Sequence, residues 1–198
     1  MTRWWWVRHA PTHSTALYGW TDLPGDLSDT VTIHRLEAFL PRDALVVASP
    51  LIRASATADA IQRNRQRLPD EPDLKELHFG AWDGLRFDQI VPEDQPLARD
   101  FWQCPGDVAP PGGESWNQVG NRVGAAVARL TRENGGRDII AVAHFGVILA
   151  QLQRATGMPP VAAIAFEIGN LSVTCMEFHP CGAWPAGHWR VRFVNHLP

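Results

Sequence analysis

TRWWWVRHAPT, residues 2–12, contains three consecutive tryptophans, then a valine, an arginine and a histidine, and, after one alanine, a proline. Residues 3–7 predict a short β-strand, and successive side chains of a strand point to opposite faces of its sheet. Large apolar rings would therefore cover both faces, which is typical of a parallel sheet with helices on both sides. The predicted strand ends at Arg8 and His9, so polar groups capable of chemistry follow it at once.

Two further apolar runs repeat this pattern. Residues 44–48 (ALVVA) and 138–143 (DIIAVA) predict strands, and each is followed by a polar turn and a predicted helix, over 49–66 and 144–157. Alternation of strands and helices indicates an α/β protein. We therefore expect residues 1–198 to form a single-domain, three-layer α/β/α sandwich with a mostly parallel central sheet.

The other elements follow from helical periodicity, capping residues and turn residues. Prolines and aromatic residues crowd one segment that lacks a clear period. In chain order, the predictions are a helix over 27–40 capped by Ser28 or Asp29, an irregular lid or insertion over 85–111, a long helix over 112–136 that begins at Glu114 or Ser115, and strands over 163–178 and 188–194.

Composition narrows the class of protein. The formal net charge of −3 argues against a nucleic-acid binder, which normally presents a basic face. No apolar run reaches the ~18 residues that a membrane span needs, and the N-terminus lacks the pattern of a signal peptide. We expect neither a nucleic-acid nor a membrane partner.

The cysteines are few and odd in number: Cys104, Cys175 and Cys181. This usage favours a reduced, cytoplasmic compartment. Cys175, His179 and Cys181 suggest a metal corner, but no second ligand pair stands at zinc-site spacing. We expect no metal site.

The polar residues at the strand ends form the first functional signal. The first strand ends in Arg8 and His9, the second is followed by Arg53 one turn into a helix, and the third ends in His144. Ligands of open α/β sheets bind beyond the carboxyl ends of the strands. Each residue alone has a plain structural explanation, as a cap or a surface group. Together they predict a site for a phosphate dianion, which guanidinium groups and helix N-termini bind well.

Five ordered motifs give the chain a family resemblance. Together they resemble the histidine phosphatase superfamily, whose members include the cofactor-dependent phosphoglycerate mutases. The likeness covers most of residues 3–157, and in chain order the motifs are VRHAPT, VASPLIRASATA, LKELHFGAWDGL, GGESWNQVGNRV and IIAVAHFGVILA. The resemblance implies a phosphohistidine enzyme on a mostly parallel sheet, with no cofactor.

The resemblance also implies roles for individual residues. His9 matches the nucleophile that accepts the phosphoryl group, and Arg8 and Arg53 match the arginines that clamp the phosphate. His144 matches the second histidine of the pocket. Glu76, in the ELHFG segment, matches the acidic group that protonates the leaving group and then activates water. The reasoning from the residues alone leaves Asp83 and Glu114 open as alternative proton donors.

Three positions depart from the family pattern. Ala10 stands where the family usually has a glycine after the nucleophile, and Phe145 stands where a glycine often follows the second histidine. Thr15 occupies the position of a phosphate-binding asparagine, and its hydroxyl can still donate to a phosphate oxygen. These departures leave open a non-catalytic module that only binds a phosphorylated ligand.

Within the family, we expect a metal-independent phosphomonoester phosphatase that acts on a small phosphorylated metabolite. The phosphoglycerate mutases carry an insertion and a tail over the site, for which the C-terminal VNHLP gives no sign. A mutase remains the alternative. RHAPT, YGWTDLP and ELHFGAWDG are most similar to α-ribazole phosphatases. An aromatic cleft that includes Trp20, Trp82, Trp102 and Trp116 would suit a flat leaving group, while packing of the lid is the alternative. The sequence leaves the oligomeric state open.

Overall fold

The computed structural model describes residues 1–180 and 187–198, and a single sheet runs through this part of the chain. Its strands are β1 (Thr2–Arg8), β2 (Leu45–Ala48), β3 (Gln66–Arg67), β4 (Asp138–Ala143), β5 (Val173–His179) and β6 (His188–His196). Their order in the described sheet is β3-β2-β4-β1-β5-β6. The first four in this order run parallel, β5 runs antiparallel to β1, and β6 runs antiparallel to β5. The predicted, mostly parallel sheet is confirmed.

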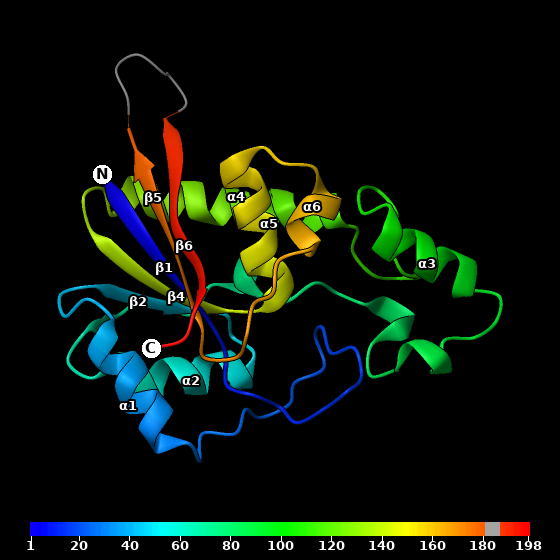
Figure 1. The fold of residues 1–198 in the computed structure, drawn as a ribbon, viewed down its shortest axis with the longest axis horizontal. Helices are drawn as coiled ribbons and strands as arrows, with labels where there is room; N and C mark the ends of the chain where they lie inside the picture. Colours follow the sequence, from blue (N-terminus) through cyan, green and yellow to red (C-terminus); the bar gives the residue numbers. More distant parts are fainter. Residues whose placement is uncertain (181–186) are drawn as a thin grey trace.

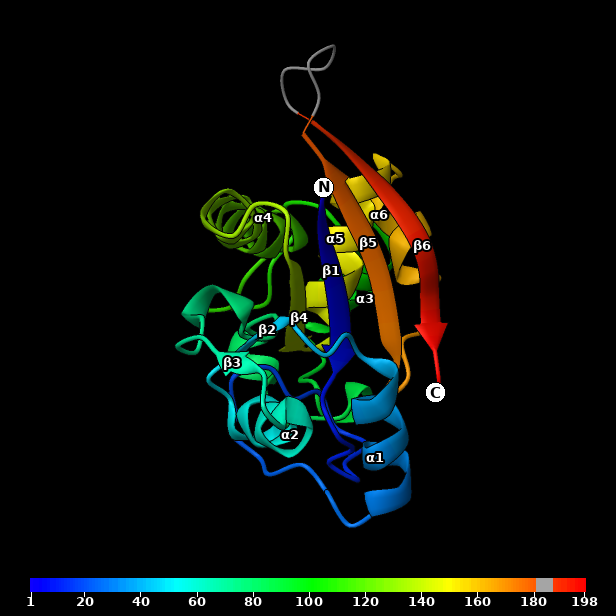
Figure 2. The same ribbon diagram turned by 90° about the vertical axis from the view of Figure 1, so that its left-hand side faces the viewer.

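Helices pack on both faces of this sheet (Figures 1 and 2). The helices are α1 (Thr30–Phe39), α2 (Ile52–Gln62), α3 (Gln95–Gln103), α4 (Trp116–Glu133), α5 (Phe145–Thr156) and α6 (Pro160–Ile164). One hydrophobic core contains residues of α1 and α2, and the other contains residues of α4 and α5. The predicted three-layer sandwich is therefore the observed architecture. Short 3-10 turns occur at Pro72–Leu74, Gly80–Trp82 and Phe87–Gln89.

The three tryptophans of β1 divide between the two faces. Trp4 and Trp6 lie in the core under α4 and α5, stacked with their ring centroids 5.2 Å apart. Trp5 points to the other face and meets Phe39 of α1 edge-on at 5.9 Å. The Trp4 indole N–H donates to Thr131 Oγ1 of α4 at 3.0 Å, which satisfies a buried polar group. The strand therefore joins both layers, as its sequence predicts.

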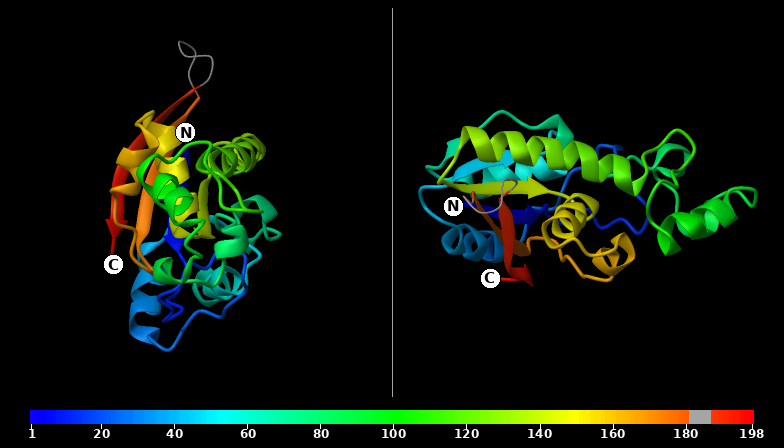
Figure 3. Two further views of the ribbon diagram at one scale, coloured as in Figure 1. Left: turned by 90° about the vertical axis from the view of Figure 1, so that its right-hand side faces the viewer. Right: turned by 90° about the horizontal axis from the view of Figure 1, so that it is seen from above.

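Several element boundaries differ from the prediction. The strand expected over 163–178 begins only at Val173, because Pro160 starts the short helix α6, and proline suits the first position of a helix. The long helix begins at Trp116 with Ser115 as its N-cap, and Asp29 caps α1. The segment 85–111, expected to be irregular, contains α3, which stands off the end of the sheet in Figures 1 and 3.

Strand register brings the predicted site residues to one edge. Arg8 lies opposite Ala143, the last residue of β4, and Ala48 at the end of β2 lies opposite Val142. Parallel strands share the edge at which they end, so the residues that follow β1, β2 and β4 meet there.

Two predictions about other classes of site can be compared with the described residues. No helix in this part of the chain is long and apolar enough to cross a membrane. The suggested metal corner includes Cys181, which lies outside the described residues. Burial raises the pKa of the Cys175 thiol to about 12, which disfavours the thiolate that binds metals.

Candidate active site

His9 follows β1 and is held with one ring nitrogen free. Its Nδ1–H donates to the carbonyl of Ala10 at 2.7 Å, and its own carbonyl accepts from Asn170 Nδ2 at 2.8 Å. A carbonyl can only accept, so the hydrogen of the neutral ring is on Nδ1. The lone pair is then on Nε2, the atom that a nucleophilic histidine must keep unprotonated.

The surroundings of His9 favour its neutral form. The residue is 6% exposed, and burial lowers its pKa to about 3, assisted by the positive charges of Arg53 and Arg8. The hydrogen bond to the Ala10 carbonyl acts in the opposite direction but is outweighed. Burial is therefore the main cause of the neutral ring, and the two guanidinium groups add to it.

His144 lies beside His9, with their ring centroids 5.0 Å apart. Its Nε2 lies 2.8 Å from Ser49 Oγ, and Ser49 Oγ already accepts the Leu51 N–H at 3.3 Å. When the Ser49 hydroxyl donates to Nε2, the hydrogen of the neutral His144 ring is on Nδ1. Among the described residues this buried Nδ1 has no partner. Burial, followed by the neighbouring His9, lowers the pKa of His144 well below its ordinary value.

Arg53, in the first turn of α2, is oriented by the loop 19–21. Its guanidinium donates to the carbonyls of Thr21 at 3.0 Å and Gly19 at 2.7 Å. The Asp83 carboxylate holds the same loop by accepting the N–H groups of Gly19, Trp20 and Thr21 at 3.3, 2.8 and 3.3 Å. Asp83 therefore fixes the loop that orients Arg53.

Arg8, the last residue of β1, is fixed on two sides. Its Nη1 donates to the Ile168 carbonyl at 2.6 Å, and its guanidinium lies 5.6 Å from the Phe145 ring centroid. Its buried Nε has no partner among the described residues, which leaves a donor for a ligand. Burial lowers the pKa of Arg8, and the nearby Glu76 carboxylate partly restores it. Phe145 thus packs on a phosphate-clamping candidate.

Glu76 reaches the N-terminus of α5 and is buried there. One carboxylate oxygen accepts the Leu77 N–H at 2.9 Å, and the other accepts the Gly146 N–H at 3.2 Å. A Cβ at Gly146 would lie 2.7 Å from Glu76 Oε1, closer than side chains tolerate. The segment 144–146 (HFG) therefore needs its glycine, Gly146, for Glu76 to approach the N-terminus of α5, which His144 caps.

Arg122 of α4 holds the segment that carries Glu76. Its guanidinium donates to the carbonyls of Asp73, Lys75 and Glu76 at 2.8, 2.8 and 2.9 Å. It also forms two 2.8 Å hydrogen bonds with the Glu114 carboxylate. Burial raises the pKa of Glu114, but the hydrogen bonds and charge of Arg122 outweigh it and lower the pKa overall. Glu114 is therefore part of a structural ion pair, which disfavours it as the proton donor.

The departures from the family pattern are accommodated differently. Ala10 is fully buried and its N–H donates to Thr57 Oγ1 at 2.9 Å. A Cβ on Gly25 would lie 3.2 Å from the Ala10 methyl, so a glycine opposite makes room for it. Thr15 is exposed, and its side chain makes no hydrogen bond to the described residues. Thr15 stays a sequence-based prediction, without a contact that joins it to the other site residues.

The aromatic cleft expected at the mouth is largely wrong. Trp82 and Trp116 are buried in the core, where their indole N–H groups donate to Asp94 and Gln153 at 3.1 and 3.2 Å. Trp102, partly buried, packs against that core. Trp20 is the exception, because it is 40% exposed and donates its Nε1–H to the Glu76 carbonyl at 2.8 Å. The centroid of its ring lies 4.5 Å from that of His78 and 4.5 Å from Lys75 Nζ.

Sequence reasoning missed four residues that support the site: Ser49, Asp83 as a loop anchor, Arg122 and Gly146. Ser49 carries a usable signal, because it directly follows a buried strand whose end faces the site. Arg122 carries none, since it belongs to the polar face of a long amphipathic helix and its carbonyl partners lie 46 to 49 residues away.

Comparisons with known proteins show the family to which this chain is similar. The sequence profile of the histidine phosphatase superfamily (branch 1) matches residues 4–191. The adenosylcobalamin/alpha-ribazole phosphatase of Escherichia coli is 30% identical over 165 residues, covering 81% of this chain and 75% of that protein. A solved mycobacterial glucosyl-3-phosphoglycerate phosphatase superposes with a TM-score of 0.83 at 27% identity, covering 98% of both chains.

A longer relative matches as well. The bifunctional protein Rv2228c of Mycobacterium tuberculosis is 34% identical over 155 residues, which are 77% of this chain and 40% of that protein. The chain thus spans well under half of this relative's length. The profile match covers nearly all of the chain, from the tryptophan strand to β6. This chain belongs to the histidine phosphatase superfamily.

Proposed function

We propose that the protein is a metal-independent phosphomonoester phosphatase that works through a phosphohistidine on His9. The observation that carries the proposal is the state of His9: a buried, neutral ring whose Nδ1–H is held by Ala10, so that Nε2 is free. A histidine kept neutral well below pH 7 and flanked by Arg8 and Arg53 suits attack on a dianion.

In the first step, Nε2 of His9 attacks phosphorus in line and the bond to the leaving oxygen breaks. Arg8 and Arg53 neutralise the equatorial oxygens, with the unpartnered Arg8 Nε among the available donors. The His144 Nδ1–H, also unpartnered among the described residues, adds a neutral donor. Glu76 delivers a proton to the leaving alkoxide, for which it must enter the step protonated.

In the second step, water attacks the phosphorus of phospho-His9, and the nitrogen–phosphorus bond breaks. Glu76 is now ionised and takes a proton from that water. Its carboxylate is already held by two backbone N–H groups, which fixes its direction between the two steps. Inorganic phosphate leaves, and His9 returns to its neutral form.

The substrate class is a small phosphorylated metabolite, and α-ribazole phosphate is the first compound to test. Relatives named for α-ribazole and for glucosyl-3-phosphoglycerate support a small phosphate ester without choosing between them. Trp20 offers an exposed ring for a flat leaving group, and Lys75 beside it offers a positive charge for an acidic one.

Hydrolysis of p-nitrophenyl phosphate in excess chelator tests the proposal. We expect turnover that survives chelation and disappears in His9→Ala. Phosphate binding without turnover would indicate a binding module instead, and interconversion of phosphoglycerates without release of free phosphate would indicate a mutase. A screen of phosphorylated metabolites, ranked by kcat/KM, then tests α-ribazole phosphate.

A further inference from the structure

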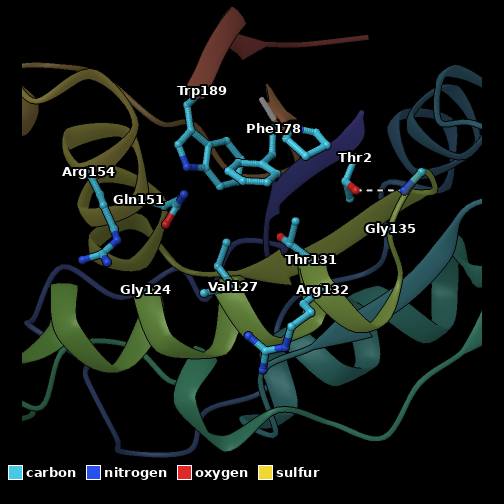
Figure 4. A pocket seen from close by; sticks show the side chains of 13 residues that line it. Thr2, Gly124, Val127, Thr131, Arg132, Gly135, Gln151, Arg154, Phe178 and Trp189 are labelled. Atoms are coloured by element: carbon cyan, nitrogen blue, oxygen red, sulfur yellow. Dashed lines mark hydrogen bonds between the residues drawn. The ribbon is translucent and has the colours of Figure 1, made fainter. Parts of the chain in front are cut away.

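A cavity of about 680 Å³ lies between α4, α5 and the strands β5 and β6 (Figure 4). Thr2, at the start of β1, lines it, whereas His9 follows the end of the same strand. Seven strand residues at ~3.3 Å each put the cavity roughly 20 Å from the candidate active site. Its occupant is therefore a different molecule from the phosphate ester at His9.

Gln151 of α5 is the polar group that this cavity leaves unsatisfied. The residue is 1% exposed, and neither its amide nitrogen nor its amide oxygen has a partner among the described residues. Figure 4 shows the side chain directed from α5 into the space. A buried amide without hydrogen bonds is costly and rare, so a donor and an acceptor stand ready here for a ligand edge.

Aromatic side chains form the wall opposite Gln151. Trp189 of β6 and Phe178 of β5 line the cavity with their ring centroids 5.2 Å apart, and Val127 of α4 adds an apolar surface. Such a wall favours a flat ring, which gains both burial and stacking. The cavity volume lies within the range of pockets that enclose a small molecule.

A positive charge stands at the rim. The guanidinium of Arg154 lies across α4 at Gly124, where a Cβ would come within 2.7 Å of Arg154 Cζ. Arg154 is exposed and forms no salt bridge within residues 1–180 and 187–198. Its donors therefore remain free for an anionic group at the rim of the cavity near α4.

We propose that this cavity binds a nucleotide. The base would stack on Trp189 and meet the Phe178 ring, which is inclined to Trp189 by 56°, with its edge. Its polar edge would pair with the Gln151 amide, and the phosphate would meet Arg154. A glutamine amide presents the adjacent donor and acceptor that match the edge of adenine. No residue of the proposed phosphatase site takes part.

Calorimetric titration with 3′,5′-cyclic AMP tests the proposal, because a phosphodiester is not a substrate for a phosphomonoesterase. We expect one saturable site in the wild type and in His9→Ala. Gln151→Leu should fold with at least wild-type thermostability, since it removes an unpaired buried amide. It should bind at least about tenfold more weakly, for the loss of two hydrogen bonds.

Gln153→Leu is the matched control on the same helix, because Gln153 accepts from Trp116 and does not line the cavity. It should keep the wild-type affinity. Arg154→Met provides a second variant and should also weaken binding. The proposal is overturned if the wild type does not bind the probe, if binding disappears in His9→Ala, or if Gln151→Leu and Arg154→Met both bind as tightly as the wild type.

Discussion

The Arg122 side chain contacts no reacting group in the proposed mechanism, yet its guanidinium binds three backbone carbonyls within the segment 73–76, which carries Glu76. Its guanidinium also forms an ion pair with Glu114, the alternative proton donor. A proton donor must lie within hydrogen-bonding reach of the leaving oxygen, and small displacements weaken catalysis strongly. Arg122 is therefore a positioning residue for Glu76.

Arg122→Met should lower kcat by about a hundredfold, as expected for a displacement of ~1 Å, while KM changes little. It should also cost roughly 3 kcal/mol of stability, because Glu114 loses its partner. Arg122→Lys keeps the charge but loses the fork, so it should recover only part of kcat. Steady-state kinetics and denaturant unfolding measure both effects. A variant that is destabilised but keeps the wild-type kcat would show a purely structural role.

The single residues of the site were predictable where they carry distinctive chemistry at a strand end. His9, Arg8, Arg53 and His144 follow or closely follow predicted strands, and the structure brings them to one edge. Thr15 rested on a count along a loop, where the backbone sets no periodic direction, and the structure leaves it exposed.

The helix α5 connects the two halves of the candidate site. Its N-cap is His144, and the N–H of Gly146 in its first turn binds the Glu76 carboxylate. The free N–H groups at a helix N-terminus suit a negative charge, so the element itself orients the acid. This arrangement requires the close approach that a glycine permits.

Gly146→Ala should therefore displace Glu76 and lower kcat at least about tenfold. Gly120→Ala is the matched control, because Gly120 lies inside α4 and a Cβ there has nothing within 4 Å. That control should keep full activity and gain about 0.5–1 kcal/mol of stability, the helix preference of alanine over glycine. Equal activity in both variants would contradict the proposed role of the first turn of α5.

Helices and strands were predictable from the sequence where one pattern of apolar residues is clear, as in β1, β4 and the capped helix α4. The prediction failed where an apolar run has no clear period. Residues 163–178 contain both the end of α6 and β5, separated by a loop that returns the chain to the sheet edge. Only the tertiary arrangement decides where such a run changes from helix to strand.

The buried histidine pair should make the stability of the entire chain depend on pH. The pKa values of His9, about 3, and of His144 are depressed in the folded state, whereas an unfolded histidine titrates near ~6.5. Below pH ~6.5 these two histidines bind protons in the unfolded chain but stay neutral in the folded chain. Stability is therefore full above the unfolded pKa and falls as the pH drops toward the folded values.

Each depressed histidine should remove up to about 1.4 kcal/mol of unfolding free energy per pH unit between pH ~6 and the onset of acid unfolding. Chemical denaturation from pH 8 to pH 4 measures this slope. His9→Asn should remove one histidine's share of it, while His34→Asn, at a surface position of α1, should leave it unchanged. Identical slopes in the wild type and His9→Asn would contradict the depressed pKa of His9.

Trapping the phosphoenzyme tests the chemistry at His9. With p-nitrophenyl phosphate the leaving group needs no proton, so Glu76→Gln should still form phospho-His9 but should hydrolyse it slowly. Rapid mixing followed by alkaline quench and peptide mass spectrometry should show one added phosphoryl group, acid-labile and located on His9. Turnover by the wild type without any such adduct in Glu76→Gln, or an adduct on another residue, would contradict a phosphohistidine mechanism at this site.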